Sequence, residues 1–464
     1  MQPSCSASRS SFMTGKYPSN NGLQLLVLMS ASQSCLPIEH KTIYDHMREE
    51  GYVTKHLGKW HLGDCDESCL PQARGIDEFR GILSGRADYF NWTMLNGVQR
   101  QVDGEPSVDN IGVHLTVLDK SDARDMILNH KDNPKPLFMC VSPTAPHEPL
   151  QSTEDMFNVH DVLDAKDPDE NKRRIYLGLV SALDDVVGET VTAIEEAGMK
   201  NNTIIVFTSD NGGAGRSSSY YPYELFSNNY PLRNGKGSFT EGGIRVPTIY
   251  YDPRLDRSAE GTKRDFLVHV TDWLPTLVQI AKQGKTDQCS SIPGIDGVSQ
   301  FVNLQSAYDR PLERKYRVRE DMLVGLTEAG TSHHGYSTCA TEDAAYRWRN
   351  FKLIYGKNYS LVDPDTKSTE WPKPEESPEL PNITGDRCHR MVDGERVVRC
   401  LFNVIDDPSE TINLFDEEPD IVETILEKIQ EARKVSVKPV YQPPLTDLSV
   451  TSKPFGGGVV DGRP

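Results

Sequence analysis

Apolar residues recur along this chain with two spacings, one typical of helices and one typical of buried strands. Residues 42–50 and 171–197 carry apolar side chains three or four positions apart, which predicts amphipathic helices. Residues 137–142 and 203–208 are short, almost uninterrupted apolar runs, which predict buried strands. This alternation predicts an α/β fold, in which a doubly wound, largely parallel sheet carries helices on both faces. Further segments of the two kinds are a strand at 52–57 and helices at 123–130 and within 264–280, with Asp272 as N-cap.

The alternation loosens in the last third of the chain. Residues 351–355 and 401–404 predict two antiparallel strands, and residues 420–435 predict a final helix whose isoleucines are four positions apart. We therefore predict two domains. The first is a large α/β domain over residues 1–315, and the second is a smaller α+β domain over residues 316–464 that ends in an irregular tail.

The composition limits what the chain can bind. Lys and Arg number 50 and Asp and Glu number 68, which gives a formal net charge of −18. A protein this acidic does not bind nucleic acid by general attraction, so an anionic substrate would need a few basic side chains gathered in one pocket. The chain contains no run of eighteen apolar residues, so we expect no membrane span. The apolar run 23–29 is too short for a span, and we interpret it as core or pocket wall.

The cysteines and glycosylation sequons favour a secretory route. The chain has nine cysteines, and setting Cys5 aside as a candidate nucleophile leaves an even number that can form disulfides. Asn-x-Ser/Thr sequons occur at Asn91, Asn201, Asn358 and Asn382. Together these features predict a secreted or lysosomal protein, and the acidic composition suits a low-pH compartment.

Small residues surround Cys5 near the start of the sequence, and Arg9 follows four positions later. If a helix begins here, its free N–H groups would stabilise a thiolate and hold an anion. This motif alone is more often an ordinary loop or helix start, so its meaning depends on the motifs that follow.

Lys59 and His61 stand two positions apart in the segment Gly58-Lys59-Trp60-His61-Leu62-Gly63. In an extended segment such residues share one face, where a cation beside an imidazole can bind an oxyanion and handle a proton. His147 follows the strand predicted at 137–142 and could bind the same oxyanion. The plainer interpretations are a surface lysine, a buried core histidine and a loop histidine between prolines.

Asp210 and Asn211 directly follow the most apolar predicted strand and precede two glycines. A carboxylate beside an amide oxygen suits a hard cation, although the same residues also form simple turns. Lys236 lies in a later Gly-rich segment, where a lysine by itself would be interpreted as a solvated loop charge.

Taken together, these motifs resemble the sulfatase family of the alkaline-phosphatase superfamily, and most closely its arylsulfatase B group. The family signature is Cys-x-Pro-Ser-Arg or Cys-x-Ala-x-Arg followed by Thr-Gly-(Arg/Lys)-Tyr, and it reads CSASRSSFMTGKYP from Cys5. The hexamer GKWHLG from Gly58 matches the family pattern in full. The resemblance implies an alkaline-phosphatase-like fold whose catalytic domain is residues 1–315.

In this family a formylglycine-generating enzyme oxidises the signature cysteine, so the resemblance implies that Cys5 becomes formylglycine. The hydrated aldehyde offers one oxygen that attacks sulfur and a second hydroxyl that later expels the sulfate. The implied reaction is the hydrolysis of a sulfate ester. The implied substrate is a sulfated glycosaminoglycan carrying N-acetylgalactosamine-4-sulfate, or an aryl sulfate.

The resemblance also implies roles for the other site residues. One Ca²⁺ per chain would be held by Cys5 as formylglycine, Asp210 and Asn211. The residues that would bind the sulfate are Lys59, His147 and Lys236. His61 would position the diol oxygen, and Arg9 would help to hold the nucleophile. The residues expected to support these are Glu148, Arg233, Glu241 and Arg245.

The arylsulfatase B resemblance further suggests a disulfide between Cys35 and Cys69, because Cys69-Leu70-Pro71 repeats the family's context. A second expected disulfide joins Cys339 to either Cys388 or Cys400.

The sequence departs from the family pattern at its beginning. Family members carry a first strand that ends in Asp-Asp and supplies metal ligands, whereas this sequence begins four residues before Cys5. We hypothesise that the sequence is truncated at its N-terminus and that a signal peptide lies upstream. With only Cys5, Asp210 and Asn211 as ligands, we expect weak Ca²⁺ binding, because Ca²⁺ takes six or more oxygens. The chain alone could then be unstable or inactive.

Two other functions stay open at this point. One is a phosphomonoester or phosphodiester hydrolase of the same superfamily, which a comparison of phosphate and sulfate ester rates would separate. The other is an inert glycan-binding relative, which the missing aspartates favour and the intact basic motifs disfavour. Binding of a sulfated sugar without sulfate release would support that second alternative.

Overall fold

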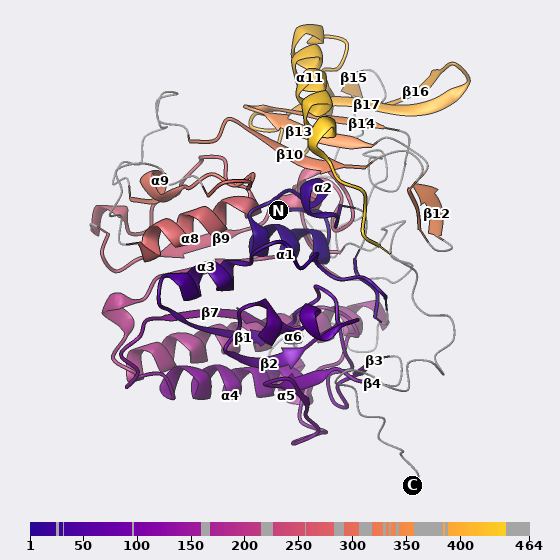
Figure 1. Ribbon diagram of the computed structural model, residues 1–464. Helices are drawn as coiled ribbons and strands as arrows, with labels where there is room; N and C mark the ends of the chain where they lie inside the picture. Colours follow the sequence, from indigo (N-terminus) through magenta and orange to yellow (C-terminus); the bar gives the residue numbers. More distant parts are fainter. Residues whose placement is uncertain are drawn as a thin grey trace. The chain divides into compact units, whose positions relative to one another are not determined.

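The computed structural model, drawn in Figure 1, divides into two compact units, and each is described by itself. The first unit consists of residues Met1–Leu26, Val206–Ile249 and Leu255–Pro439, and the second consists of Val27–Ile205, Tyr250–Arg254 and Val440–Pro464. The structure describes residues 1–24, 27–30, 32–94, 97–158, 168–214, 226–255, 257–282, 292–305, 318–327, 331–333, 336–339, 343–356, 384–385 and 388–441.

The second unit is built on a five-stranded sheet with the strand order β6-β5-β2-β1-β7. Strand β1 pairs in parallel with β2 on one side and with β7 on the other, and β5 and β6 extend the sheet in the antiparallel sense. The strands are β1 (Val53–Gly58), β2 (Glu78–Ile82), β5 (Arg100–Val102), β6 (Glu105–Pro106) and β7 (Leu137–Ser142). The prediction of a largely parallel sheet is confirmed, and the predicted bounds of β7 match those observed.

Helices cover both faces of this sheet. The ring of Tyr44 in α3 (Ile43–Glu49) packs edge-on against Phe138, on one face of the sheet. Leu57 points to the opposite face, because successive strand residues alternate, and packs against Ala123 of α4. Helix α4 (Leu115–Leu128) lies beside α6 (Pro168–Glu196), as Figure 1 shows.

The first unit contains the helix that begins at Cys5. Helix α1 (Cys5–Thr14) is followed by α2 (Pro18–Asn21). Strand β8 (Ile205–Thr208) pairs with β9 (Thr248–Tyr251), and residues 206–208 and 248–249 of this pair belong to the first unit. The segment that carries the predicted metal ligands therefore follows a strand, as the apolar run at 203–208 predicted.

Asp272 precedes α8 (Trp273–Ala281), but its side chain does not cap that helix. Its carboxylate accepts a hydrogen bond from the backbone N–H of His269 at 2.9 Å and pairs with the buried guanidinium of Arg319. Asp272 is therefore the N-cap residue of α8, as predicted, but its side chain makes no capping hydrogen bond to that helix because it binds partners outside α8.

A five-stranded antiparallel sheet forms the C-terminal part of the first unit, with the order β10-β13-β14-β17-β16. One face packs against α11, where Ile425 and Ile429 meet Leu353 and Leu401. The other face packs against Phe239, which lies three residues after Lys236. The bounds are β10 (Asp321–Leu326), β13 (Ala344–Trp348), β14 (Phe351–Gly356), β16 (His389–Val392), β17 (Glu395–Asn403) and α11 (Pro419–Val435).

The remaining elements are short. The helices are α5 (Glu154–Asn158), α7 (Glu241–Ile244) and α9 (Phe301–Gln305), and the 3₁₀ helices are η1 (Glu67–Cys69), η2 (Pro71–Arg74), η3 (Lys200–Asn202), η4 (Arg257–Ala259) and η5 (Val270–Asp272). The strands are β3 (Thr93–Met94), β4 (Gly97–Val98), β11 (Thr331–His333), β12 (Tyr336–Cys339), β15 (Thr384–Gly385) and β18 (Ile412–Asn413).

Two disulfides lie among the described residues. Cys35 bonds to Cys69, which confirms the expected pair. Cys388 bonds to Cys400, so neither is joined to Cys339, and that expectation was wrong. The two cysteines face each other because His389 and Val398 are paired in the hairpin of β16 and β17.

Several sequence-based predictions fall on residues that the structure does not describe. The predicted domain boundary at residues 315 and 316 lies outside the described residues, and so do the sequons at Asn358 and Asn382. The sequons at Asn91 and Asn201 are described and exposed.

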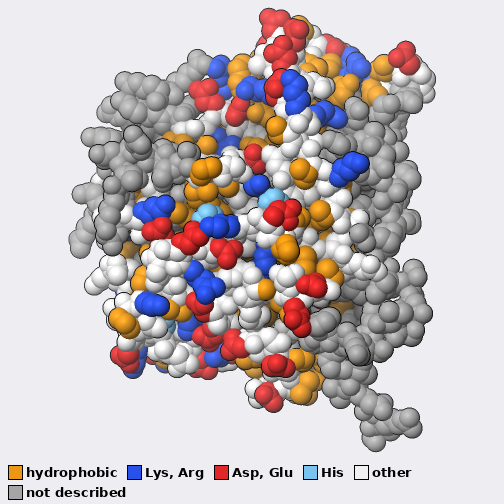
Figure 2. All heavy atoms as spheres, viewed as in Figure 1, with side chains coloured by type: hydrophobic (Ala, Val, Ile, Leu, Met, Phe, Trp, Pro, Cys, Tyr) orange, Lys and Arg blue, Asp and Glu red, His pale blue; other side chains and the backbone are white. Residues whose placement is uncertain are grey.

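The described helices and the surface charges can be compared with what the composition predicted. None of the described helices is long and apolar enough to cross a membrane. On the face drawn in Figure 2, Asp and Glu side chains lie interspersed with Lys and Arg. The net charge of −18 is therefore not gathered in one patch on that face.

Candidate active site

Helix α1 places Cys5 at its first position. Ser4 has an extended backbone before the helix, and Gly15 ends the helix with a φ of 66°, a left-handed conformation that favours glycine. The small side chains that follow Cys5 are mostly buried, so the helix packs closely against its surroundings. Cys5 itself is 1% exposed, at the end of the helix where the backbone dipole is positive.

Cys5 contacts two of the residues predicted for the site. Its thiol donates a hydrogen bond to Oδ1 of Asn211 at 3.2 Å, and Nζ of Lys236 donates to its Sγ at 3.1 Å. An ammonium, an amide oxygen and a helix N-terminus thus meet at one buried sulfur. Such a place favours negative charge on the atom at that position and on any group bound to it.

The side chain of Asn211 is oriented by its own turn. Its Nδ2 donates to the carbonyl of Gly212 at 2.8 Å, which directs Oδ1 toward Cys5. The backbone N–H of Gly212 donates to the carbonyl of Gly243 at 2.9 Å, and a Cβ on Gly212 would lie 1.8 Å from the carbonyl oxygen of Gly242. The turn after β8 therefore requires glycine at position 212. Asp210 precedes this amide and is half-buried.

Lys236 is only 6% exposed, so it is not the solvated loop charge that its segment alone would indicate. Its backbone N–H donates to the carbonyl of Gly213 at 2.9 Å, and the next N–H, of Gly237, donates to the carbonyl of Pro3 at 2.8 Å. These bonds tie the lysine segment to the Asn211 turn and to the residues just before α1.

A buried cluster of charges lies behind the lysine segment. Nζ of Lys352 lies 2.7 Å from Oε1 of Glu241 and 2.7 Å from Oε1 of Glu410, and it donates to the carbonyl of Phe239 at 2.9 Å. Burial raises the pKa of Glu410 to about 7, although Lys352 opposes that shift. Burial also opposes ionisation of Glu241, but Lys352 and Arg347 hold the pKa of Glu241 below its ordinary value.

Lys352 and Glu410 were not among the residues predicted for this region. The signal was a lysine at the second position of the otherwise apolar segment Phe351-Lys352-Leu353-Ile354-Tyr355. A charge at such a position is buried only when it is paired.

Lys59 and His61 follow β1 in the second unit. The backbone N–H of Lys59 donates to the carbonyl of Ser142 at 2.8 Å, and that of His61 donates to the carbonyl of Leu83 at 2.9 Å. Each of the two side chains is 5% exposed. Nε2 of His61 bonds to the carbonyl of Leu28 at 2.9 Å, so this nitrogen carries a proton. A Cβ on Gly85 would lie 2.4 Å from Cε1 of the imidazole, so a glycine there lets the ring fit.

His147 lies in the loop after β7. Its backbone N–H donates to the carbonyl of Thr144 at 2.9 Å, and its carbonyl accepts from the hydroxyl of Tyr89 at 2.8 Å. Nδ1 of the ring donates to the carbonyl of Glu148 at 3.0 Å, so a neutral ring carries its lone pair on Nε2. Glu148 is an ion-pair partner of Arg86.

The predicted residues thus fall into two groups. Direct contacts join Cys5, Asn211 and Lys236 in the first unit, where Arg9 lies one helical turn after Cys5 on the same side of α1. The second unit holds Lys59, His61 and His147 near the carboxyl ends of two paired parallel strands, β1 and β7.

Comparison with known proteins identifies the family. Residues 1–283 match the family described as Sulfatase.

This chain belongs to the sulfatase family.

Mouse arylsulfatase J is 31% identical to this sulfatase over 456 residues, which are 96% of this chain and 70% of that protein. Human arylsulfatase A is 27% identical over 295 residues, 60% of this chain and 54% of that protein. Mouse N-acetylgalactosamine-6-sulfatase is 26% identical over 401 residues, 82% of this chain and 70% of that protein. The sulfatase prediction is therefore confirmed, and assignment to the arylsulfatase B group stays a prediction.

Solved structures agree on the fold. The crystal structure of Ps i-CgsB in complex with k-i-k-neocarrahexaose has a TM-score of 0.71 at 23% identity and covers 98% of this chain and 87% of that one. The crystal structure of the PsFucS1 sulfatase from Pseudoalteromonas sp. has a TM-score of 0.60 at 20% identity and covers 92% and 81%. The family match and the curated relatives, not these structures, make the chain an enzyme of the sulfatase class.

Proposed function

We propose that this sulfatase hydrolyses the sulfate ester of a sulfated sugar or an aryl sulfate, with residue 5 as the nucleophile. One observation carries the proposal: the buried Sγ of Cys5 lies at the N-terminus of α1 between Oδ1 of Asn211 and Nζ of Lys236. In the mature enzyme this sulfur stands for an oxygen of hydrated formylglycine. That group would supply one oxygen to attack sulfur and a second hydroxyl whose deprotonation expels sulfate.

The contacts of Cys5 explain how the chain serves such a nucleophile. The ammonium of Lys236 offsets negative charge at residue 5 and on the bound ester, and it is already fixed before substrate arrives. The positive end of α1 acts on the same atoms. Arg9, one turn later, adds a third positive group on that side of the helix.

The same residues fit a hard cation. The amide of Asn211 is turned so that its oxygen, not its nitrogen, faces residue 5. Asp210 adds a carboxylate beside it, and oxygen ligands of these two kinds suit Ca²⁺. Asp210, Asn211 and residue 5 would hold the ion, which would act as a Lewis acid toward the sulfate oxygens.

From the family resemblance we propose sulfate-binding roles for the second group of residues as well. Lys59 and His147 would bind nonbridging sulfate oxygens, and His61 would orient the attacking oxygen. Support comes from the burial of Lys59 and His61 and from the tautomer of His147, whose Nε2 lone pair can take a proton or whose imidazolium can donate one. Lys236 would also contact the leaving-group oxygen.

The proposed function also implies a cellular location, a maturation step and a leading substrate. We propose a secreted or lysosomal enzyme that a formylglycine-generating enzyme matures at Cys5, with an N-acetylgalactosamine sulfate as the leading substrate. The sequons at Asn91 and Asn201 are exposed, as glycosylation requires, and two disulfides are formed.

The test compares an aryl sulfate with the matching aryl phosphate. We expect the chain, produced with a formylglycine-generating enzyme, to hydrolyse the sulfate ester faster, and Cys5→Ala to hydrolyse neither. Faster release of phosphate would favour a phosphoester hydrolase, and binding of a sulfated sugar without sulfate release would favour an inert relative.

A further inference from the structure

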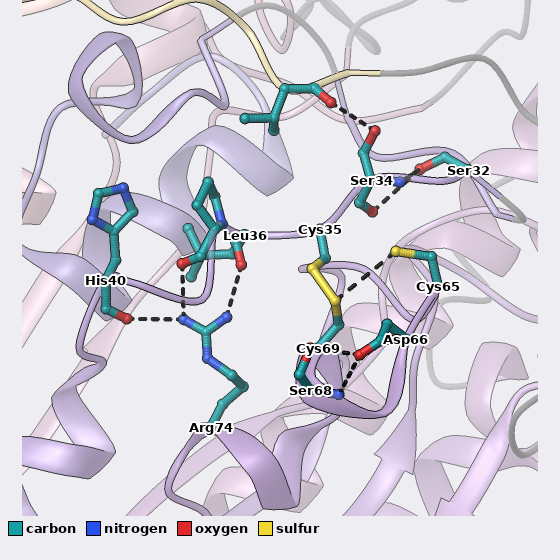
Figure 3. The surroundings of a disulfide bond; sticks show 12 residues. Ser32, Ser34, Cys35, Leu36, His40, Cys65, Asp66, Ser68, Cys69 and Arg74 are labelled. Carbon is teal, nitrogen blue, oxygen red and sulfur yellow. Dashed lines mark hydrogen bonds between the residues drawn. A yellow bond between two sulfur atoms is a disulfide. The ribbon is translucent and has the colours of Figure 1, made fainter.

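Three sulfur atoms lie together in the second unit, outside the proposed active site. Cys35 and Cys69 form a disulfide, and Sγ of Cys65 lies 3.9 Å from Sγ of Cys69 (Figure 3). All three sulfurs lie within 4.8 Å of one another. Cys65 is exposed and is not part of a disulfide. Because two of the three sulfurs are already bonded, the cluster offers one thiol and not three thiolate ligands for a metal.

Local structure holds Cys65 beside the disulfide. The carboxylate of Asp66 accepts a hydrogen bond from the N–H of Ser68 at 2.9 Å and so caps the 3₁₀ helix η1. The N–H of Cys69 donates to the carbonyl of Asp66 at 3.0 Å. This turn brings residues 65 and 69 onto one side, and Figure 3 shows the thiol of Cys65 directed at the sulfur of Cys69.

We propose that Cys35, Cys65 and Cys69 form a thiol–disulfide exchange site. The thiolate of Cys65 attacks Sγ of Cys69, a Cys65–Cys69 bond forms, and the Cys35–Cys69 bond breaks. Cys35 leaves as a thiolate. It then takes up one proton, which balances the proton that Cys65 lost when it formed its thiolate. The number of disulfides is unchanged, so the step needs no external oxidant or reductant.

The surroundings of Cys65 control the rate of this step. Partial burial and the negative charges of Asp64 and Asp66 raise the pKa of the Cys65 thiol, although a backbone hydrogen bond opposes the shift. Only the thiolate attacks a disulfide. The exchange is therefore slow in acid and quickens as the pH rises toward that pKa.

The disulfide also braces the segment that carries Lys59 and His61. The N–H of Leu36, next to Cys35, donates to the carbonyl of Leu62 at 2.9 Å, and Nε1 of Trp60 donates to the carbonyl of Cys69 at 3.2 Å. A Cβ on Gly63 would lie 2.3 Å from Cβ of Cys35, so the two backbones touch. Exchange would break the covalent link between Cys35 and Cys69 and leave residues 35 and 36 held to this segment by hydrogen bonds. A consequence for catalysis rests on the proposed function, whereas the exchange itself does not.

Peptide mapping tests the exchange directly. Trypsin gives a peptide of residues 17–41 that contains Cys35 and a peptide of residues 60–74 that contains both Cys65 and Cys69. The full chain is incubated at about pH 8.5, near the ordinary pKa of a thiol, quenched in acid and labelled with N-ethylmaleimide. Before exchange the two peptides are joined and Cys65 is labelled. After exchange the first peptide is free and labelled, and the second is unlabelled and lacks two hydrogens.

We expect the Cys35 label to appear with an initial rate that rises about tenfold per pH unit below the pKa of Cys65, because the thiolate fraction does so. The Cys65→Ser variant, which changes an exposed side chain, should leave Cys35 unlabelled. In Cys35→Ser we expect a Cys65–Cys69 disulfide within peptide 60–74. In that variant the Cys65–Cys69 bond needs an oxidant, so it is equilibrated with oxidised glutathione before mapping. The proposal is overturned if Cys35 is never labelled in the native chain, if Cys65→Ser labels it equally, or if Cys35→Ser keeps two thiols after equilibration with oxidised glutathione.

Discussion

Replacing Lys352 by Met removes an ammonium that lies 2.7 Å from a carboxylate oxygen of both Glu241 and Glu410. The ammonium is fully buried, and the two carboxylate side chains are 2% and 0% exposed. Met has a similar length, so the change deletes the charge and its hydrogen bonds while it fills most of the same space. The variant would leave Glu241 and Glu410 in the core without this ammonium, and Arg245 and Arg347 would remain near Glu241 alone.

The expected loss of stability follows from that geometry. Removing one partner of a buried ion pair costs about 3–5 kcal/mol, because the remaining charge stays desolvated and uncompensated. Lys352 pairs with both carboxylates and donates hydrogen bonds to Glu241 and to the carbonyl of Phe239, so we expect a loss within that range. The cost should shrink in acid, where Glu241 and Glu410 can bind protons and become neutral.

Urea unfolding at neutral pH and at about pH 5 measures both effects, because the midpoint shifts with the free energy of unfolding. The matched control is Lys434→Met, which removes a 65% exposed lysine that pairs with Glu431 and should change stability by less than about 0.5 kcal/mol. Equal stability of Lys352→Met and Lys434→Met at neutral pH would refute the reasoning. A loss that does not shrink in acid would show that lost packing, not lost charge, is responsible.

Three further predictions follow from the site and its supports. Burial raises the pKa of Glu410 to about 7, so between about pH 4.5 and pH 7 the folded protein keeps a proton on Glu410 that the unfolded chain has lost. The free energy of unfolding therefore falls as the pH rises through this range, by up to about 1.4 kcal/mol per pH unit. Glu410→Gln should flatten this part of the stability profile. Gly212→Ala should lower both the thermal stability and the rate of hydrolysis, because its Cβ would lie 1.8 Å from the carbonyl oxygen of Gly242. The control is Gly188→Ala in α6, where no atom lies within 4 Å of the added Cβ, and it should be neutral or stabilising in the same thermal unfolding assay. Lys236→Met should lower kcat for an aryl sulfate by about 10²–10³-fold, and an unchanged kcat with residue 5 fully converted would remove Lys236 from the mechanism.

Hydrophobic spacing predicted much of the fold. The strand at 137–142 was predicted with its observed bounds, because the apolar run is short and ends cleanly. Helix α4 was predicted only from residue 123, although it begins at Leu115. Its first two turns mix apolar and charged residues, and the cap is His114, whose ring nitrogen accepts from the N–H of Thr116. Neither feature is a common sequence signal for the beginning of a helix.

The features that the sequence did not predict depend on contacts between residues that are distant in the chain. Asp272 stands where a helix cap is expected, but its charge pairs with Arg319, 47 positions later. The family resemblance implied that Cys5, Asn211 and Lys236 belong to one site, and the structure places Asn211 and Lys236 in contact with Cys5. The orientation of the Asn211 amide depends on the turn at Gly212, which no residue pattern specifies.

The most direct test of the central claim relates sulfate release to the chemical state of residue 5. Preparations with different degrees of conversion at Cys5 are assayed on one aryl sulfate, and the converted fraction is measured by mass spectrometry of the tryptic peptide of residues 1–9. We predict a rate of sulfate release that is proportional to the converted fraction and zero without conversion. A fully converted chain that releases no sulfate, or an unconverted chain that releases it at the same rate, would contradict the account.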